Sequence, residues 1–208
     1  MPDPHQPNNM VTDITNIDPL TSCLEDTANE DIADDSELLP IDGEDVDGGD
    51  VDVTIQKLDG RRRCLEACID IPDTSQLVWD VLTDYEGLSE FIPNLVESCI
   101  VGEQDGCTLL RQVGTQKFSF LKFSAAVTLK METIPTERID FTMLEGDFIE
   151  FFGCWQLSDV GDTTRLSYAI TILPPRKMPI QIVQRRLRSD LASNLVAIQQ
   201  EVARRSAA

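Results

Sequence analysis

Histidine is nearly absent from this chain of 208 residues, which has a single one, His5, in a polar, proline-rich start. Ser-His-Asp triads, cysteine–histidine pairs, histidine general bases and histidine-ligated zinc or iron sites all require that side chain. The sequence therefore predicts no catalytic residues of these kinds, no metal site and no cofactor.

Long apolar runs and paired cysteines are missing as well. No apolar run approaches the roughly 18 residues that are needed to cross a bilayer. The six cysteines form no C-x-x-C pair, and the first residues show neither the basic nor the apolar region of a secretory signal. We interpret the cysteines as reduced thiols. A transit peptide would be basic and poor in acids, so the acidic start favours a cytoplasmic protein. Peripheral contact with a membrane is compatible with this location.

Basic residues are scarce, because 17 of them face 37 acidic ones and the net charge is -20. Residues 1–60 hold 17 of the acidic side chains and one basic one, Lys57, which leaves a net charge of only -4 for residues 61–208. A nucleic-acid-binding protein normally presents a basic face to the phosphates. The balance of charge therefore predicts no nucleic-acid partner.

The first 60 residues combine this acidity with isolated apolar residues at no sustained period. Such a segment buries too little apolar surface to offset the entropy of ordering it. We predict a disordered acidic tail over residues 1–60 and one domain over residues 61–208. Residues 42–52 resemble a calcium loop in composition, but the twelfth place counted from Asp45 is Gln56 instead of glutamate. A solvated linker is the preferred interpretation of this stretch.

From residue 61 the periodicity predicts a fold. Alternating apolar residues indicate a first strand over residues 65–71, a helix capped by Asp73 or Thr74, and a short helix near residues 85–92. About six further strands follow, separated by turn signals such as Asp105-Gly106. The chain closes with its longest helix, in which apolar residues from Ile180 to Val202 recur every three or four positions.

This order predicts an α+β protein in which an antiparallel sheet wraps a helix. A curved antiparallel sheet of about seven strands would wrap the long C-terminal helix, with two short helices after the first strand. A strongly bent sheet and a helix cannot close everywhere, so an elongated apolar cavity is expected between them, and such a cavity is a natural ligand site. The alternative is that side chains fill this space, and periodicity does not separate the two.

Five segments of the chain carry a resemblance to a known family. They are Val78 to Asn94, Gly146-Asp-Phe148, Gly153-Cys-Trp-Gln-Leu157, Thr164-Arg-Leu-Ser-Tyr168 and Leu173-Pro-Pro175. Together they resemble the polyketide cyclase/dehydrase and lipid-transport superfamily (START-like, SRPBCC), and within it most nearly the coenzyme-Q-binding START-type proteins. The resemblance covers residue 61 to the C-terminus. It implies the helix-grip (START-like) fold and a hydrophobic ligand such as a lipid, quinone, sterol or polyketide.

We predict that the cavity is lined from the sheet and the helices by twelve residues: Trp79, Phe91, Ile92, Arg111, Leu121, Phe123, Val127, Trp155, Tyr168, Ile170, Leu187 and Leu191. The two tryptophans could stack on a ring, although large aromatic residues are more often core. Tyr168 shares the apolar face of its strand, so its hydroxyl needs a partner and is the best candidate for a polar ligand contact. Arg111 is in phase with Leu109 and Val113 and is also expected to point inward.

A basic cluster lies before and within the last helix, at Arg176, Lys177, Arg185, Arg186 and Arg188. Near a cavity mouth it would favour transient contact with an anionic membrane surface. The alternatives are the solvated face of an amphipathic helix and a landing site for the acidic tail.

These observations leave three classes of function. The first is a non-catalytic, monomeric carrier of a lipid or prenylquinone, with opening at residues 84–93 setting exchange. The second is an aromatase/cyclase-like enzyme in which Tyr168, Arg111 and Glu150 supply acid–base groups around a polyketide. The third is a protein-interaction module with a solid core and no ligand.

Overall fold

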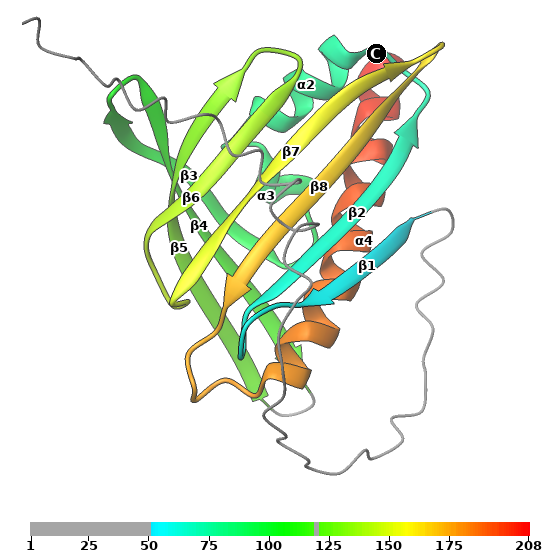
Figure 1. The fold of residues 1–208 in the computed structure, drawn as a ribbon. Helices are drawn as coiled ribbons and strands as arrows, with labels where there is room; N and C mark the ends of the chain where they lie inside the picture. The colour runs from blue at the N-terminus through cyan, green and yellow to red at the C-terminus, as the bar shows by residue number, and fades with distance from the viewer. Residues whose placement is uncertain (1–50, 119–120) are drawn as a thin grey trace, which may run out of the picture.

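The computed structural model describes residues 51–118 and 121–208, so most of the predicted tail, including residues 42–50, lies outside the described residues. Figure 1 shows one large sheet with a long helix behind it. The sheet has eight antiparallel strands in the order β1-β2-β8-β7-β6-β5-β4-β3. The strands are β1 (Asp52–Lys57), β2 (Arg63–Ile71), β3 (Leu95–Gln104), β4 (Cys107–Phe118), β5 (Leu121–Ile134), β6 (Arg138–Gly146), β7 (Glu150–Val160) and β8 (Thr163–Leu173).

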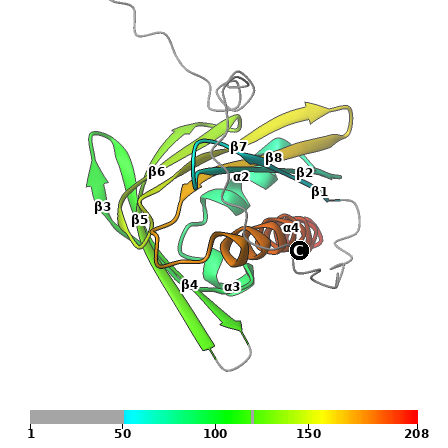
Figure 2. The ribbon, with the colours of Figure 1, turned by 60° about the horizontal axis from the view of Figure 1, so that its bottom comes forward.

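Three helices accompany the sheet, namely α2 (Ser75–Thr83), α3 (Leu88–Phe91) and α4 (Ile180–Ser206). Thr74 caps α2, because its hydroxyl accepts a hydrogen bond of 3.3 Å from the Leu77 backbone N–H. In Figure 2 the sheet curves around α4. The predicted helix-grip fold, with short helices after the first long strand and a long C-terminal helix, is confirmed.

Strand β1 corrects the predicted domain boundary. The tail was expected to reach residue 60, yet residues 52–57 pair with β2 from Asp52 opposite Cys68 to Lys57 opposite Arg63. Val53 is buried in the core, while its neighbour Thr54 is exposed. The alternation of apolar and polar residues is short here, and the surrounding acidic residues led to the prediction of a tail. Charged side chains are, however, common on an edge strand. The described domain therefore begins with β1, ahead of residue 61.

The core lies between one side of the sheet and the C-terminal half of α4. Leu65 and Leu166 from β2 and β8 are fully buried there, as are Leu195 and Ile198 from the helix. Burying each such side chain contributes about 1.5–3 kcal/mol relative to leaving it exposed. The predicted apolar stripe of α4 continues toward its N-terminus, but Val183 and Leu187 are only half-buried. One half of the stripe closes the core, and the other half faces the cavity described below.

Gly153 in β7 marks a close approach between strands. A Cβ atom there would collide with the Ala169 carbonyl oxygen, and it would lie 2.7 Å from Phe141 Cζ and 2.9 Å from the Ile170 Cα. A glycine inside a strand often marks a bend or a site where another group approaches the backbone closely. The atoms that occupy the space belong to the neighbouring strands, so Gly153 serves the packing of the sheet.

We expect Gly153→Ala to lower the free energy of unfolding by about 1–3 kcal/mol, because the added methyl group forces the backbone and Phe141 apart. Denaturant unfolding monitored by circular dichroism measures this change. Gly102→Ala is the matched control, since the nearest atom to its Cβ would be Leu109 Cδ1 at 4.0 Å. Equal losses in the two variants would contradict the steric explanation.

Candidate functional site

A cavity of about 410 Å³ lies between the sheet and the N-terminal half of α4. Its walls come from β4 to β8, from α4, and from the segment between α2 and β3. Cavities that hold small molecules in proteins have volumes of roughly 300–1,000 Å³. The alternative of a solid core, which the sequence left open, therefore does not describe this region.

The opening of the cavity is identified by lining residues that are also exposed. They lie on the segment after α3 (Pro93 and Asn94), at the start of β5 (Ser124), and before and within α4 (Lys177, Pro179 and Ile182). Of these, Ile182 is a large apolar side chain with an exposed fraction of 41%. The opening thus combines apolar groups with a lysine.

Alternation along the strands selects the side chains of the wall. Leu110 and Gln112 of β4 lie opposite Leu129 and Val127 of β5, and all four line the cavity. Across β7 and β8, Trp155 pairs with Tyr168, and their rings stack at a centroid distance of 3.7 Å and an angle of 2°. A flat aromatic surface is therefore built into the wall from two neighbouring strands.

Polar groups in this apolar wall are few. The Tyr168 hydroxyl forms no hydrogen bond with any group in residues 51–118 or 121–208, and its side chain is 9% exposed. The Oδ1 atom of Asn194, on α4, is buried and has no hydrogen-bond partner in the same part of the chain. Buried polar atoms normally find a partner. These two groups can therefore hold the polar end of a ligand.

Asp190 stands one helical turn before Asn194 and also lines the cavity. Its carboxylate accepts a hydrogen bond of 3.3 Å from Asn94 Nδ2, which links α4 to the segment after α3. Burial raises the pKa of the Tyr168 phenol, and the neighbouring Cys154 and Asp190 side chains add to this effect. Tyr168 is therefore a neutral hydrogen-bond donor at ordinary pH.

Seven of the twelve predicted lining residues lie on the cavity wall, which are Ile92, Val127, Trp155, Tyr168, Ile170, Leu187 and Leu191. Trp79 and Phe91 are half-buried and pack against the hydrophobic core instead. The side chains of Leu121 and Phe123 lie outside the described part of the structure. Whether these residues contact a ligand stays a prediction.

The expected inward position of Arg111 is wrong. Its side chain is exposed, and its Nε donates a hydrogen bond of 3.0 Å to Glu97 Oε1 on β3. Arg111 does share a face with Leu109 and Val113, but that face is the outer one, since Leu110 and Gln112 line the cavity. Alternation shows which residues share a face, and it does not show which face is inward when both carry apolar residues.

Glu150 also lies away from the cavity wall. It forms two hydrogen bonds with Arg62, of 2.7 and 2.8 Å, and this guanidinium lowers the pKa of the Glu150 carboxyl. From the sequence, Glu150 and Arg165 are expected to be either solvated or paired with each other, and in the structure Arg165 pairs with Asp70 instead. The three acid–base residues of the enzyme hypothesis therefore do not converge on one point.

Sequence reasoning missed Asp190 and Asn194. Both share one helix face with Leu187, Leu191 and Ile198, at the same spacing of three and four residues. Two polar residues on an otherwise apolar stripe were the signal that could have identified them. A search for apolar periodicity alone passes over such positions.

The predicted basic cluster divides into two groups. Lys177 and Arg186 line the cavity, and Lys177 is exposed at its opening. Arg185 and Arg188 are exposed on the other side of α4 and are absent from the cavity wall. The five cations therefore do not form one patch around the opening.

Within the described residues no helix is both long and apolar enough to cross a membrane, and no three acidic, cysteine or histidine side chains gather where they could hold a metal ion. The stretch that resembled a calcium loop lies mostly outside the described residues.

Residues 71–196 match the family model described as polyketide cyclase/dehydrase and lipid transport. None of the curated proteins is similar enough in sequence to count as a match. Among solved structures, TTHA0849 from Thermus thermophilus is 23% identical with a TM-score of 0.60, over 69% of this chain and 99% of that one.

Two further structures share the fold. The Zhui aromatase/cyclase from a Streptomyces species is 17% identical with a TM-score of 0.61, over 70% of this chain and 96% of that one. A STAR-related lipid transfer protein from Xanthomonas axonopodis is 13% identical with a TM-score of 0.61, over 74% and 94%. At these identities the likeness concerns the fold alone.

The chain has only two tyrosines, so their ionisation tests the burial described above. Burial raises the pKa of Tyr85 to about 12 and also raises that of Tyr168, from an ordinary value of 10.0. We expect the ultraviolet absorbance of phenolate to stay absent at pH 10 in the folded chain and to reach half its amplitude near pH 10 in denaturant. A tyrosine that ionises near pH 10 in the folded chain would contradict this burial.

The same shifts fix the direction in which stability changes with pH. Between about pH 10 and 12 the unfolded chain binds fewer of these protons than the folded chain. The free energy of unfolding should therefore be undiminished by these groups below pH 10 and fall as the pH rises through this range.

Proposed function

The chain belongs to the polyketide cyclase/dehydrase and lipid transport family, and on that premise we propose that it binds and carries an elongated apolar small molecule without transforming it. The observation that supports this most is the open cavity of about 410 Å³ beneath the half-buried N-terminal half of α4. Apolar ligand surface buried there contributes about 25 cal/mol per Å² to binding. No reacting group is needed for such a function.

The polar lining suggests the shape of the ligand. Most of the wall is apolar, while Tyr168 and Asn194 offer a hydroxyl and an amide without partners in the described chain. A molecule with a long apolar body and one polar end fits this distribution, which is the general form of a lipid or a prenylquinone. The family match is not specific to coenzyme Q. The choice of a prenylquinone is therefore our proposal and rests on the sequence resemblance alone.

An aromatase/cyclase-like reaction is the second candidate, since a protein named as an aromatase/cyclase shares the fold. Of the residues that the sequence offered for it, only Tyr168 lies in the cavity, while Arg111 and Glu150 form ion pairs elsewhere. The carrier therefore accounts for more of the observed wall. A cytoplasmic location, monomeric state and the exchange of ligand at residues 84–93 stay predictions.

We also propose that the opening contacts anionic membrane surfaces transiently. Lys177 and Arg186 place positive charge beside the exposed Ile182 at the opening. Each cation near an anionic surface contributes about 1 kcal/mol to binding. The other three cations of the predicted cluster, Arg176, Arg185 and Arg188, are not required for this contact.

Filling the cavity tests the carrier. We expect Ala125→Phe, which places a ring on the cavity wall, to reduce binding of the amphiphilic dye 1-anilinonaphthalene-8-sulfonate at least tenfold while the chain stays folded. The full chain, purified from its host, should also lose a co-purifying small molecule that native mass spectrometry detects in the unsubstituted protein. Organic extraction of that protein identifies the molecule.

Ala126→Phe is the matched control, because Ala126 is the next residue of β5 and is not part of the cavity wall. Dye binding that falls equally in both variants, or that survives Ala125→Phe, would refute the cavity as the binding site. Turnover of an added polyketide by the unsubstituted chain would favour the enzyme.

The membrane contact is tested by the double variant Lys177→Gln and Ile182→Ser. We expect it to reduce sedimentation of the full chain with vesicles of phosphatidylcholine and phosphatidylserine at least threefold. Lys130→Gln with Ile134→Ser is the matched control, since Ile134 is also exposed, at 51% against 41% for Ile182, but neither Lys130 nor Ile134 lines the cavity. Equal binding by the two variants would argue against contact at the opening.

A further inference from the structure

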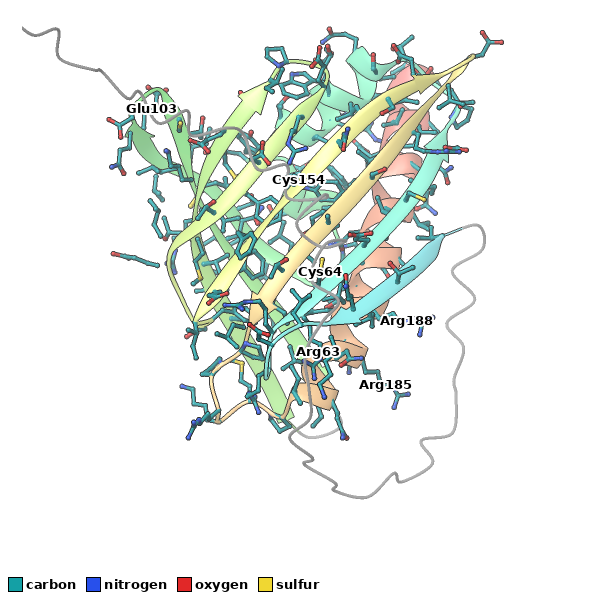
Figure 3. All side chains as sticks on the ribbon, viewed as in Figure 1. Arg63, Cys64, Glu103, Cys154, Arg185 and Arg188 are labelled. Carbon is teal, nitrogen blue, oxygen red and sulfur yellow. The ribbon has the colours of Figure 1, made fainter. Side chains whose placement is uncertain are left out.

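Arg185 and Arg188 form an exposed basic surface on α4 that the cavity does not use. They stand three residues apart, so they are neighbours on one side of the helix. Figure 3 shows both side chains projecting outward from α4, below β1 in this view. Neither forms an ion pair with a carboxylate of residues 51–118 or 121–208. By contrast, Arg204 and Arg205 at the other end of α4 pair with Glu201.

Two further arginines add positive charge at this corner of the molecule. Arg63 is 8% exposed, and its Nε donates a hydrogen bond of 3.1 Å to Gln184 of α4. Arg61 donates to the carbonyl oxygens of Pro175 and Met178. These partners are neutral, so they leave both charges uncompensated. Burial and the charge of Arg61 accordingly lower the pKa of Arg63.

The chain outside the described residues supplies the opposite charge close by. Residues 1–50 contain 15 acidic side chains and no lysine or arginine. Five of these acids lie in residues 42–50, immediately before the described chain begins at Val51 and enters β1. We propose that this acidic segment, residues 42–50, docks on the basic surface formed by Arg185 and Arg188.

The register of the strands places this surface within the span of a nine-residue segment that precedes β1. Arg63 contacts Gln184, and Gln199 donates a hydrogen bond of 3.1 Å to the Asp70 carbonyl, so β2 runs beside α4 from one glutamine to the other. Asp52 lies opposite Cys68, near the far end of this path. By interpolation it stands level with about residue 195, roughly 11 Å along the helix from Arg188. Nine extended residues span up to about 30 Å.

The energetics favour a dynamic contact. A single exposed ion pair contributes only about 0–1 kcal/mol, but a tethered segment has an effective concentration in the millimolar range. Several weak pairs are therefore enough to hold it for much of the time. Salt should release it, because the screening length falls to about 3 Å at 1 M ionic strength. This inference does not depend on the identity of the ligand in the cavity.

The test compares two neutralised forms of the full chain by NMR. One removes the five acids of the segment, through Asp42→Asn, Glu44→Gln, Asp45→Asn, Asp47→Asn and Asp50→Asn. The matched control removes five acids of the same types farther from β1, through Asp3→Asn, Asp13→Asn, Asp18→Asn, Glu25→Gln and Asp26→Asn. The amide and Nε–Hε signals of Arg185 and Arg188 are the readout, and those of Arg204 are the internal reference.

We expect the first form alone to move the Arg185 and Arg188 signals, toward the positions that they take in the unsubstituted chain at 1 M salt. Signals that move equally in both forms, or in neither, would overturn the proposal. A membrane is the competing occupant of this surface. If Arg185→Gln with Arg188→Gln lowers binding of the full chain to phosphatidylserine vesicles, the surface faces lipid and the proposal fails. Unchanged vesicle binding supports occupation by the acidic segment.

Discussion

The packing of α4 against only one side of a curved sheet determines the rest of the structure. The helix contacts β1, β2 and the two short helices, whereas strands β4 to β8 face it across the cavity. Leu195 and Ile198 are therefore fully buried, while Val183 and Leu187 remain half-buried on the same apolar stripe. The cavity follows from this geometry, because a sheet that turns away from a straight helix cannot contact it along its whole length.

This geometry links stability to binding. The N-terminal half of α4 buries less apolar surface than the C-terminal half. Each Å² of apolar surface that stays uncovered forgoes about 25 cal/mol of stabilisation. A ligand in the cavity would cover that surface. Because it would bind the folded state and not the unfolded state, it would stabilise the fold by mass action. The polar atoms of Tyr168 and Asn194 act in the same sense, because each stays without a partner in the described chain until a ligand supplies one.

Features that depend on periodicity could be predicted from the sequence. The prediction failed where it had to decide which face of a strand points inward, or whether a short apolar alternation among acidic residues forms a strand. The order of elements, the long helix and the Asp105-Gly106 turn, whose residues have φ of 53° and 78°, were all readable. Strand β1 was missed because three apolar residues, Val51, Val53 and Ile55, stand among acids. Arg111 was misplaced because its strand carries apolar residues on both faces. Asn194 interrupts an apolar stripe, and the register of facing strands is needed to see that it meets a cavity.

A net charge of -20 opposes the approach of the whole chain to an anionic surface, but charge acts locally in salt solution. At physiological ionic strength the screening length is about 8 Å, which is shorter than the helix that separates the opening from the paired arginines at the C-terminus of α4. In the membrane contact that we propose, the charges of Lys177 and Arg186 at the opening therefore act on an approaching surface more strongly than the distant acidic residues do. Because Arg185 and Arg188 lie off the cavity wall while Lys177 and Arg186 line it, the two proposed contacts, of the acidic segment and of a lipid surface, would not compete for the same side chains.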